Sequence, residues 1–252
     1  MLRFAPLLFS VVLLLHADTQ PAEMVNEGKP IHIPFQCVQE ELQSLGLDCS
    51  EDEPCPVYLE LSAIESGARL FVTGNIHTPT ATLSSILLAT SDDGKTWSEP
   101  YRRLRFSALD QIQFFDLANG WIAGEVVQTL PRDPFLLITN DGGKTWKERP
   151  IVEDGHSGSI EHFRFESAKT GALVIGSKGS GYELYGTTDG GESWALRQSS
   201  AKAINIPGAS TQAETTWRLR PDRKNHAYNI EKRDTNGWHV IAGFLVDVAA
   251  CK

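Results

Sequence analysis

The chain has 252 residues, of which 41% are hydrophobic and 22% are charged. This composition is typical of a folded domain and excludes a disordered, collagen-like or polytopic membrane protein. The 32 acidic residues outnumber the 23 basic residues, which gives a net charge of −9. Because nucleic acids and anionic membranes bind basic surfaces, this balance argues against both as partners.

The first 17 residues have the features of a secretory signal peptide. A single cation, Arg3, precedes an apolar stretch from Leu7 to Leu15, which is shorter than the about 20 residues that a membrane-spanning helix needs. We expect cleavage after Ala17; a later site near Ala22 and an uncleaved anchor are the alternatives. The mature protein is therefore predicted to be secreted or periplasmic, with no membrane span after cleavage.

Residues 18–55 are predicted to form an N-terminal cap with a short helix, ahead of a repeat region at residues 56–252. The chain has four cysteines: Cys37, Cys49, Cys55 and Cys251. In an exported protein an even number of cysteines favours disulfides, here two. We favour Cys55 with Cys251 at the closure of the fold, and Cys37 with Cys49 across the helical pattern. The sequence has no C-x-x-C pair and no metal-ligand histidine spacing, so no metal and no cofactor are predicted.

Three similar segments recur along the chain, namely TSDDGKTW, TNDGGKTW and TTDGGESW. Their last residues are Trp97, Trp146 and Trp194, so the repeat is 49 and then 48 residues long. Each segment follows a short apolar run and precedes another extended stretch, which predicts a tight hairpin between two strands.

The residue types of these segments suit a structural hairpin. The aspartate accepts hydrogen bonds from the turn, the glycine takes a positive φ, and the tryptophan wedges between sheets while its indole N–H finds a carbonyl. All of these roles serve folding. The residues concerned are Asp92, Gly94 and Trp97; Asp141, Gly143 and Trp146; and Asp189, Gly191 and Trp194.

The pattern (S/T)-x-D-x-G-x-(S/T)-W resembles the Asp box of sialidase-type, or BNR-repeat, β-propellers. This resemblance implies an all-β propeller in which each box joins the third and fourth strands of a blade, at the periphery and on the face away from any active site. The stretch from Ile112 to Gly124 also resembles the repeat of the photosystem II stability and assembly factor family.

Each repeat has room for four strands, and a degraded fourth unit follows the third. Its expected strands are Trp217–Arg220, Tyr228–Lys232 and Trp238–Val246, with residues 234–238 as a remnant of the box. We therefore predict a small propeller of four four-stranded blades, with the N-terminal segment as its cap. The alternative is a fifth blade that borrows strands from the N-terminal segment.

The loops expected on the face opposite the boxes carry polar residues, which in a propeller surround the mouth of the central channel. They are candidates for a binding site, although solvated loop charges would look the same. The candidates are Arg102, Arg105, Asp110, Gln111, Arg132, Asp133, Glu161 and His162.

A sialidase-type hydrolase would use Arg102, Arg105 and Arg132 to hold a substrate carboxylate, and Asp110 or Glu161 as the acid. The Phe-Arg-Ile-Pro motif that accompanies sialidase activity is absent, and no tyrosine–glutamate nucleophile pair is recognisable. We therefore expect an exported, monomeric, non-enzymatic propeller that holds a protein or glycan, as the likeness to assembly factors implies. A sialidase-superfamily glycoside hydrolase is the alternative, and it requires that these arginines and acids converge.

Overall fold

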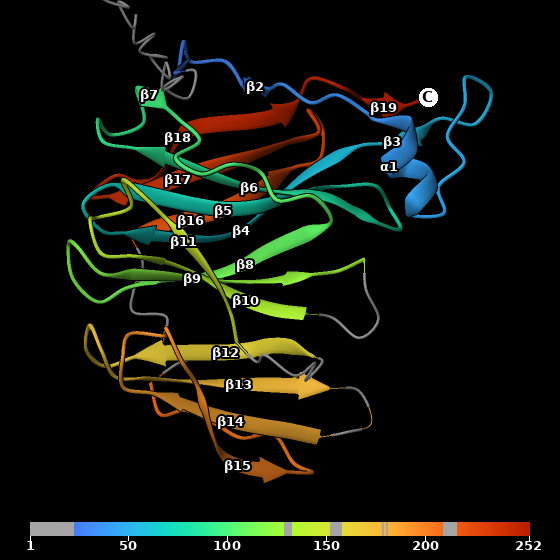
Figure 1. Ribbon diagram of the computed structural model, residues 1–252. Helices are drawn as coiled ribbons and strands as arrows, with labels where there is room; N and C mark the ends of the chain where they lie inside the picture. The colour runs from blue at the N-terminus through green and yellow to red at the C-terminus, as the bar shows by residue number, and fades with distance from the viewer. Residues whose placement is uncertain (1–22, 129–132, 152–157, 178, 180, 209–215) are drawn as a thin grey trace, which may run out of the picture.

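The computed structural model describes residues 23–128, 133–151, 158–177, 179, 181–208 and 216–252. The fold is nearly all β, as predicted: sheets of up to four strands pack face to face in a small propeller-like arrangement, with one short helix, α1 (Gln39–Ser44) (Figure 1). No helix in the described ranges is long and apolar enough to cross a membrane.

The first sheet contains three long antiparallel strands, and the first box follows the last of them. A short strand beyond the box runs along the edge of the sheet and pairs with the N-terminal segment. These strands are β4 (Tyr58–Ser66), β5 (Leu70–His77), β6 (Thr82–Thr90), β7 (Thr96–Trp97) and its partner β1 (Met24–Val25).

The second and third sheets each contain four antiparallel strands in chain order, as expected for the second and third repeats. The second sheet is formed by β8 (Ser107–Phe114), β9 (Gly120–Val126), β10 (Asp133–Thr139) and β11 (Lys147–Pro150). The third is formed by β12 (Ser159–Phe165), β13 (Gly171–Ser177), β14 (Gly181–Thr187) and β15 (Ala195–Ser200).

The fourth sheet combines the two ends of the chain. The strands β16 (Trp217–Asp222), β17 (Ala227–Asp234) and β18 (Gly237–Val246) are antiparallel, and β2 (Ile31–Ile33) joins β18 as a parallel fourth strand. The N-terminal segment thus completes the fourth sheet, and the alternative of a fifth blade does not hold for the described residues.

The fourth sheet is not a worn copy of the box repeat, which corrects the sequence interpretation. Asp234 and Gly237 pair across a tight hairpin that joins the second and third strands of the sheet, whereas a box joins the third and fourth. The strands of this sheet also run in the opposite direction to the corresponding strands of the first sheet. Its Lys232 Nζ lies 3.0 Å from Asp93 in the first box, while His226, at the other end of β17, lies beside Tyr58 at the start of β4.

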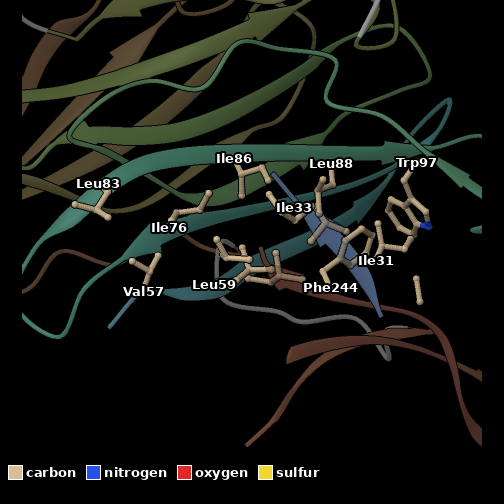
Figure 2. Packing of buried hydrophobic residues seen from close by; sticks show 14 of the residues in the cluster. Ile31, Ile33, Val57, Leu59, Ile76, Leu83, Ile86, Leu88, Trp97 and Phe244 are labelled. Atoms are coloured by element: carbon tan, nitrogen blue, oxygen red, sulfur yellow. The ribbon is translucent and has the colours of Figure 1, made fainter. Parts of the chain in front are cut away.

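The sheets pack in the order fourth, first, second, third (Figure 1). Strand β4 contacts β16 on one side and β8 on the other, and β12 contacts β8 and β9. Figure 2 shows the core between the first and fourth sheets, where Ile33, Ile76, Ile86 and Phe244 are fully buried. Each such side chain contributes about 1.5–3 kcal/mol by leaving water, which explains why the central strands are apolar on both faces.

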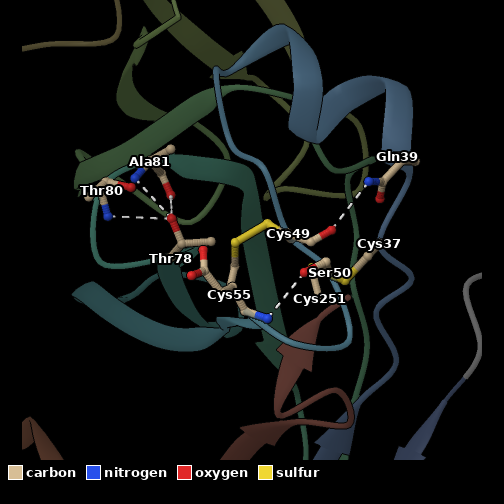
Figure 3. Close-up of a disulfide and its surroundings, with 10 residues drawn as sticks. Cys37, Gln39, Cys49, Ser50, Cys55, Thr78, Thr80, Ala81 and Cys251 are labelled. Atoms are coloured by element: carbon tan, nitrogen blue, oxygen red, sulfur yellow. Dashed lines mark hydrogen bonds between the residues drawn. A yellow bond between two sulfur atoms is a disulfide. The ribbon is translucent and has the colours of Figure 1, made fainter.

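Two disulfides form, as expected, but the favoured pairing was wrong. Cys37 is bonded to Cys251 and Cys49 to Cys55, with Cα–Cα distances of 5.6 and 5.4 Å (Figure 3). The chain turns back after Cys49, where Ser50 N donates to Glu53 O at 3.1 Å, and this brings Cys55 beside Cys49. Cys37, on the other side of α1, is left for Cys251. Strand β19 (Ala250–Cys251) still pairs with β3 (Cys55–Pro56), so the chain ends do meet where expected.

Candidate active site

The three box hairpins lie on one side of the molecule, after the third strands of their sheets. In the first box, Thr90 Oγ1 donates to Asp92 Oδ1 at 2.8 Å, and Thr96 donates its N–H to Oδ1 at 2.9 Å and its hydroxyl to Oδ2 at 2.8 Å. These bonds, first of all that from the Thr96 N–H, lower the pKa of Asp92 to about 2. Asp141 and Asp189 accept equivalent bonds in the other two boxes. The carboxylates of the three box aspartates thus accept hydrogen bonds within their own turns and serve the structure of the hairpins.

The glycines of the boxes allow close approach to a neighbouring sheet. Gly94 has φ +83°, and a Cβ added there would lie 2.4 Å from a methyl group of Ile241 in the fourth sheet. Gly143 has φ +74°, and its Cβ would lie 2.4 Å from the ring of Phe71 in the first sheet. A residue other than glycine would therefore be strained in its backbone and would push the sheets apart.

The tryptophans of the first two boxes contact the same neighbouring sheets. Trp97 packs edge-on against Phe244 of the fourth sheet at 5.1 Å between centroids, and Trp146 against Phe71 of the first at 5.8 Å. Only the indole of Trp97 meets the hydrogen-bond expectation, donating to Gly94 O at 3.1 Å. The indole nitrogens of Trp146 and Trp194 are buried without a partner in the described part of the chain.

On the opposite side, the first strand of each of the first three sheets carries a β-bulge. The pairing skips Ser62 in β4, Asp110 in β8 and Glu161 in β12. A bulge turns an extra side chain out of the regular alternation and is over-represented beside active sites. Two of the predicted site residues, Asp110 and Glu161, thus occupy the same position in successive sheets.

A cleft of about 160 Å³ lies between the second and third sheets beside these bulges. Asp110 and Gln111 of β8 line it together with Glu125 of β9 and Ser159 of β12. Asp110 is exposed, whereas Glu125 is only 6% exposed. We call this the central cleft.

Hydrogen bonds fix the chain around the central cleft. Asn75 Oδ1 of the first sheet accepts from Leu109 N at 3.0 Å, and its Nδ2 lies 3.4 Å from Asp110 Oδ1. Gln111 Nε2 donates to the carbonyl oxygen of Ile160 at 2.9 Å, which links the second sheet to the third. The first sheet therefore helps to hold the chain around a cleft that the second and third sheets line.

Glu125 was missed by the sequence analysis. It lies near the end of an apolar strand, GWIAGEV, where a single acidic residue is usually interpreted as the solvent-exposed end of the strand. The signal that could have found it is its equivalent position in the first sheet. Gly74 pairs with Leu61 there, as Gly124 pairs with Leu109 in the second sheet. Glu125, the residue after Gly124, is therefore equivalent to Asn75, which is buried.

Arg102 and Arg105 do not join the central cleft. Arg102 lies 3.1 Å from Glu148 of β11, and Arg105 lies 2.7 Å from Glu41 of α1. Arg132 lies outside the described residues. Asp133 is exposed at the start of β10, and His162 Nε2 accepts from Ile206 N at 3.3 Å. The lining of the central cleft, within the described ranges, therefore contains no arginine clamp for a substrate carboxylate.

The comparisons with known proteins are sparse. No family model matches the sequence, and no curated protein matches it. Two matching solved structures are both described as an ulvan lyase from a new family of polysaccharide lyases, PL25, one of them bound to -[GlcA(1-4)Rha3S]-. Each has 9% identity and a TM-score of 0.39, with 77% of this chain and 54% of the lyase covered. The chain thus spans about half the length of these structures.

These comparisons contradict the expectation of a non-enzymatic binding protein. The matching structures are described as polysaccharide lyases, which are enzymes, whereas the alternative in the sequence analysis was a sialidase-superfamily glycoside hydrolase. The likeness to the photosystem II assembly factors stays a likeness of one repeat, because no family model supports it.

Proposed function

We propose that this protein is a carbohydrate-active enzyme that cleaves a glycosidic bond at the central cleft. The observation that carries the proposal is the pair of carboxylates, Asp110 and Glu125, which border one cleft between two sheets and differ sharply in exposure. Glycosidic cleavage is commonly performed by two carboxyl groups, one that protonates the leaving oxygen and one that attacks the sugar or activates water.

The two environments suggest which group has which role. Glu125 is shielded from bulk water, which suits a proton donor to the glycosidic oxygen. Asp110 is open to solvent, which suits a carboxylate that activates a water molecule or attacks the sugar carbon. Asn75, at 3.4 Å from Asp110, would orient that carboxylate, and Gln111 would keep the two sheets at a constant separation.

The other parts of the proposal concern the whole chain. The three hairpins are Asp boxes of a BNR-type propeller, and residues 1–17 are a leader. Residues 18–55 cap the fold and also lend β1 and β2 to its sheets, and the mature monomer acts on a glycan outside the cytoplasm. Two disulfides within the described residues support an oxidising compartment.

The test is a cleavage assay of the mature protein on aryl glycosides and on neutral and acidic polysaccharides, read as new reducing ends. We expect Asp110→Asn and Glu125→Gln each to lower kcat by about 10²-fold or more, as the loss of a general acid or base does. The control is Glu166→Gln, an exposed carboxylate in the turn that follows β12, which should keep full activity.

Failure of the wild-type protein to release reducing ends from any substrate would overturn the proposal, as would full activity in both carboxylate variants. Ultraviolet absorbance from a new double bond would show elimination instead of hydrolysis, which would overturn the roles assigned to the two carboxylates.

A further inference from the structure

A second and larger cleft, of about 410 Å³, opens between the N-terminal segment and the first sheet. Phe35, Val38 and Leu83 form its apolar wall, and Arg103, Arg105, Glu41 and Asp247 are its charged residues. Its volume lies in the range of about 300–1,000 Å³ that is usual for small-molecule sites. We call it the cap cleft.

The walls of the cap cleft are held in place by the structure. The Arg103 guanidinium donates to Glu99 at 2.6 and 2.8 Å and to Pro34 O at 2.7 Å. The Cys37–Cys251 disulfide fixes the N-terminal wall, because Gln36 and Val38 on either side of Cys37 both line the cleft. Binding of a ligand would therefore cost little conformational entropy of the protein, which favours binding.

The lining of the cap cleft carries both signs of charge in equal number. Arg105 is 2.7 Å from Glu41, and Asp247 is 2.8 Å from His32. A charged ligand would gain no net attraction from such a lining and would have to break these pairs. A ligand with an apolar face and several hydroxyl groups would suit it, since carboxylates accept and guanidinium groups donate to hydroxyls.

One further group supports a hydroxyl-bearing ligand. Ser84 lines the cap cleft and is 5% exposed, and its Oγ has no hydrogen-bond partner among the described residues. An unpaired buried hydroxyl is costly. A sugar hydroxyl bound in the cap cleft would give Ser84 a partner.

We propose that the cap cleft is a subsite for an uncharged sugar unit of the glycan that is cleaved at the central cleft; this inference rests on the proposed function. The two clefts lie along one stretch of chain. Arg105 and Asp110 are five residues apart, a span of at most about 18 Å. A single oligosaccharide can therefore occupy both clefts, and the acidic central cleft disfavours anionic sugars as well.

The test is affinity electrophoresis of the mature protein in gels that contain galactomannan, xyloglucan, mixed-linkage β-glucan, pectate or alginate. We expect retardation by at least one neutral polysaccharide and by neither polyuronate. Arg105→Gln and Phe35→Ala should raise the apparent Kd about tenfold. Arg102→Gln is the matched control, because this arginine is three residues away and 68% exposed but pairs with Glu148 outside the cleft; its Kd should change less than twofold.

The outcomes separate this inference from the proposed function. Binding that persists in Asp110→Asn and Glu125→Gln but is lost in Arg105→Gln, with an unchanged thermal midpoint, supports the subsite. Equal loss in Arg105→Gln and Arg102→Gln, retardation only by polyuronates, or no retardation at all overturns it. If Arg105→Gln changes neither Kd nor KM while Asp110→Asn abolishes turnover, the subsite is wrong and the proposed function stands.

Discussion

At the residue scale, the box aspartates couple the stability of the fold to pH. The pKa of Asp92, Asp141 and Asp189 is lowered to about 2 in the folded protein. In Asp141 burial, the largest single effect, raises the pKa, but hydrogen bonds from Thr145 and Thr139 together outweigh it. Because an unfolded aspartate titrates near 3.9, the unfolded chain takes up these protons first as the pH falls.

We therefore predict that the contribution of the boxes to stability is complete above about pH 4 and is lost as the pH falls toward about 2. Urea unfolding at a series of pH values measures this as the number of protons taken up on unfolding. Asp141→Asn should lower that number by about one in this window, since the amide does not titrate. An unchanged proton uptake would show that Asp141 is not held ionised by its turn.

At the element scale, one aromatic pair joins the second sheet to the third. Trp121 of β9 is 1% exposed and stacks on Phe165 of β12 at 3.7 Å between centroids, and its indole donates to Gly190 O at 2.8 Å. The second sheet thus reaches the third box through a tryptophan that does not belong to any box. The stack and the hydrogen bond thus join the same two sheets as the bond from Gln111 to Ile160.

We predict that Trp121→Phe costs about 1 kcal/mol more in the free energy of unfolding than Trp146→Phe. Both substitutions keep an aromatic ring and lose similar volume, but only Trp121 has an acceptor for its N–H, while the buried nitrogen of Trp146 has none in the described part of the chain. Chemical denaturation of the two variants measures the difference. Equal costs would mean that the bond to Gly190 contributes nothing.

Much of this element-scale structure follows from the sequence, because the box hairpins are local. Their spacing predicted the strands of three sheets. It also predicted β16, β17 and β18 of the fourth sheet. It did not predict the fourth strand of that sheet, because β2 reaches β18 only through long-range packing, and it took the turn at residues 234–238 for a box, because a turn with Asp, Gly and Trp has the same letters after a second strand as after a third. Asp110 was found because it was expected in an exposed link, although it lies at a bulge of β8, whereas Glu125 was hidden in an apolar strand. Arg102 and Arg105 pair instead with Glu148 and Glu41.

At the scale of the whole molecule, the two ends of the chain are joined in the fourth sheet. Strand β2 completes the fourth sheet beside β18, and the disulfide from Cys37 to Cys251 joins the segment after β2 to the last strand. The same disulfide borders the cap cleft. One covalent bond therefore supports both the joining of the chain ends and the shape of that cleft.

The two disulfides should differ in their contribution to stability. The Cys37–Cys251 bond spans 214 residues, and the Cys49–Cys55 bond spans 6. If disulfides act by restricting the unfolded chain, the long loop contributes about 5 kcal/mol and the short one about 2 kcal/mol. We predict that the Cys37→Ser, Cys251→Ser double variant unfolds at a clearly lower urea concentration than the Cys49→Ser, Cys55→Ser double variant. The first variant should also bind neutral glycan more weakly, because the wall of the cap cleft at Gln36 and Val38 is released. Equal unfolding midpoints would mean that packing of β2 on β18 alone holds the ends together.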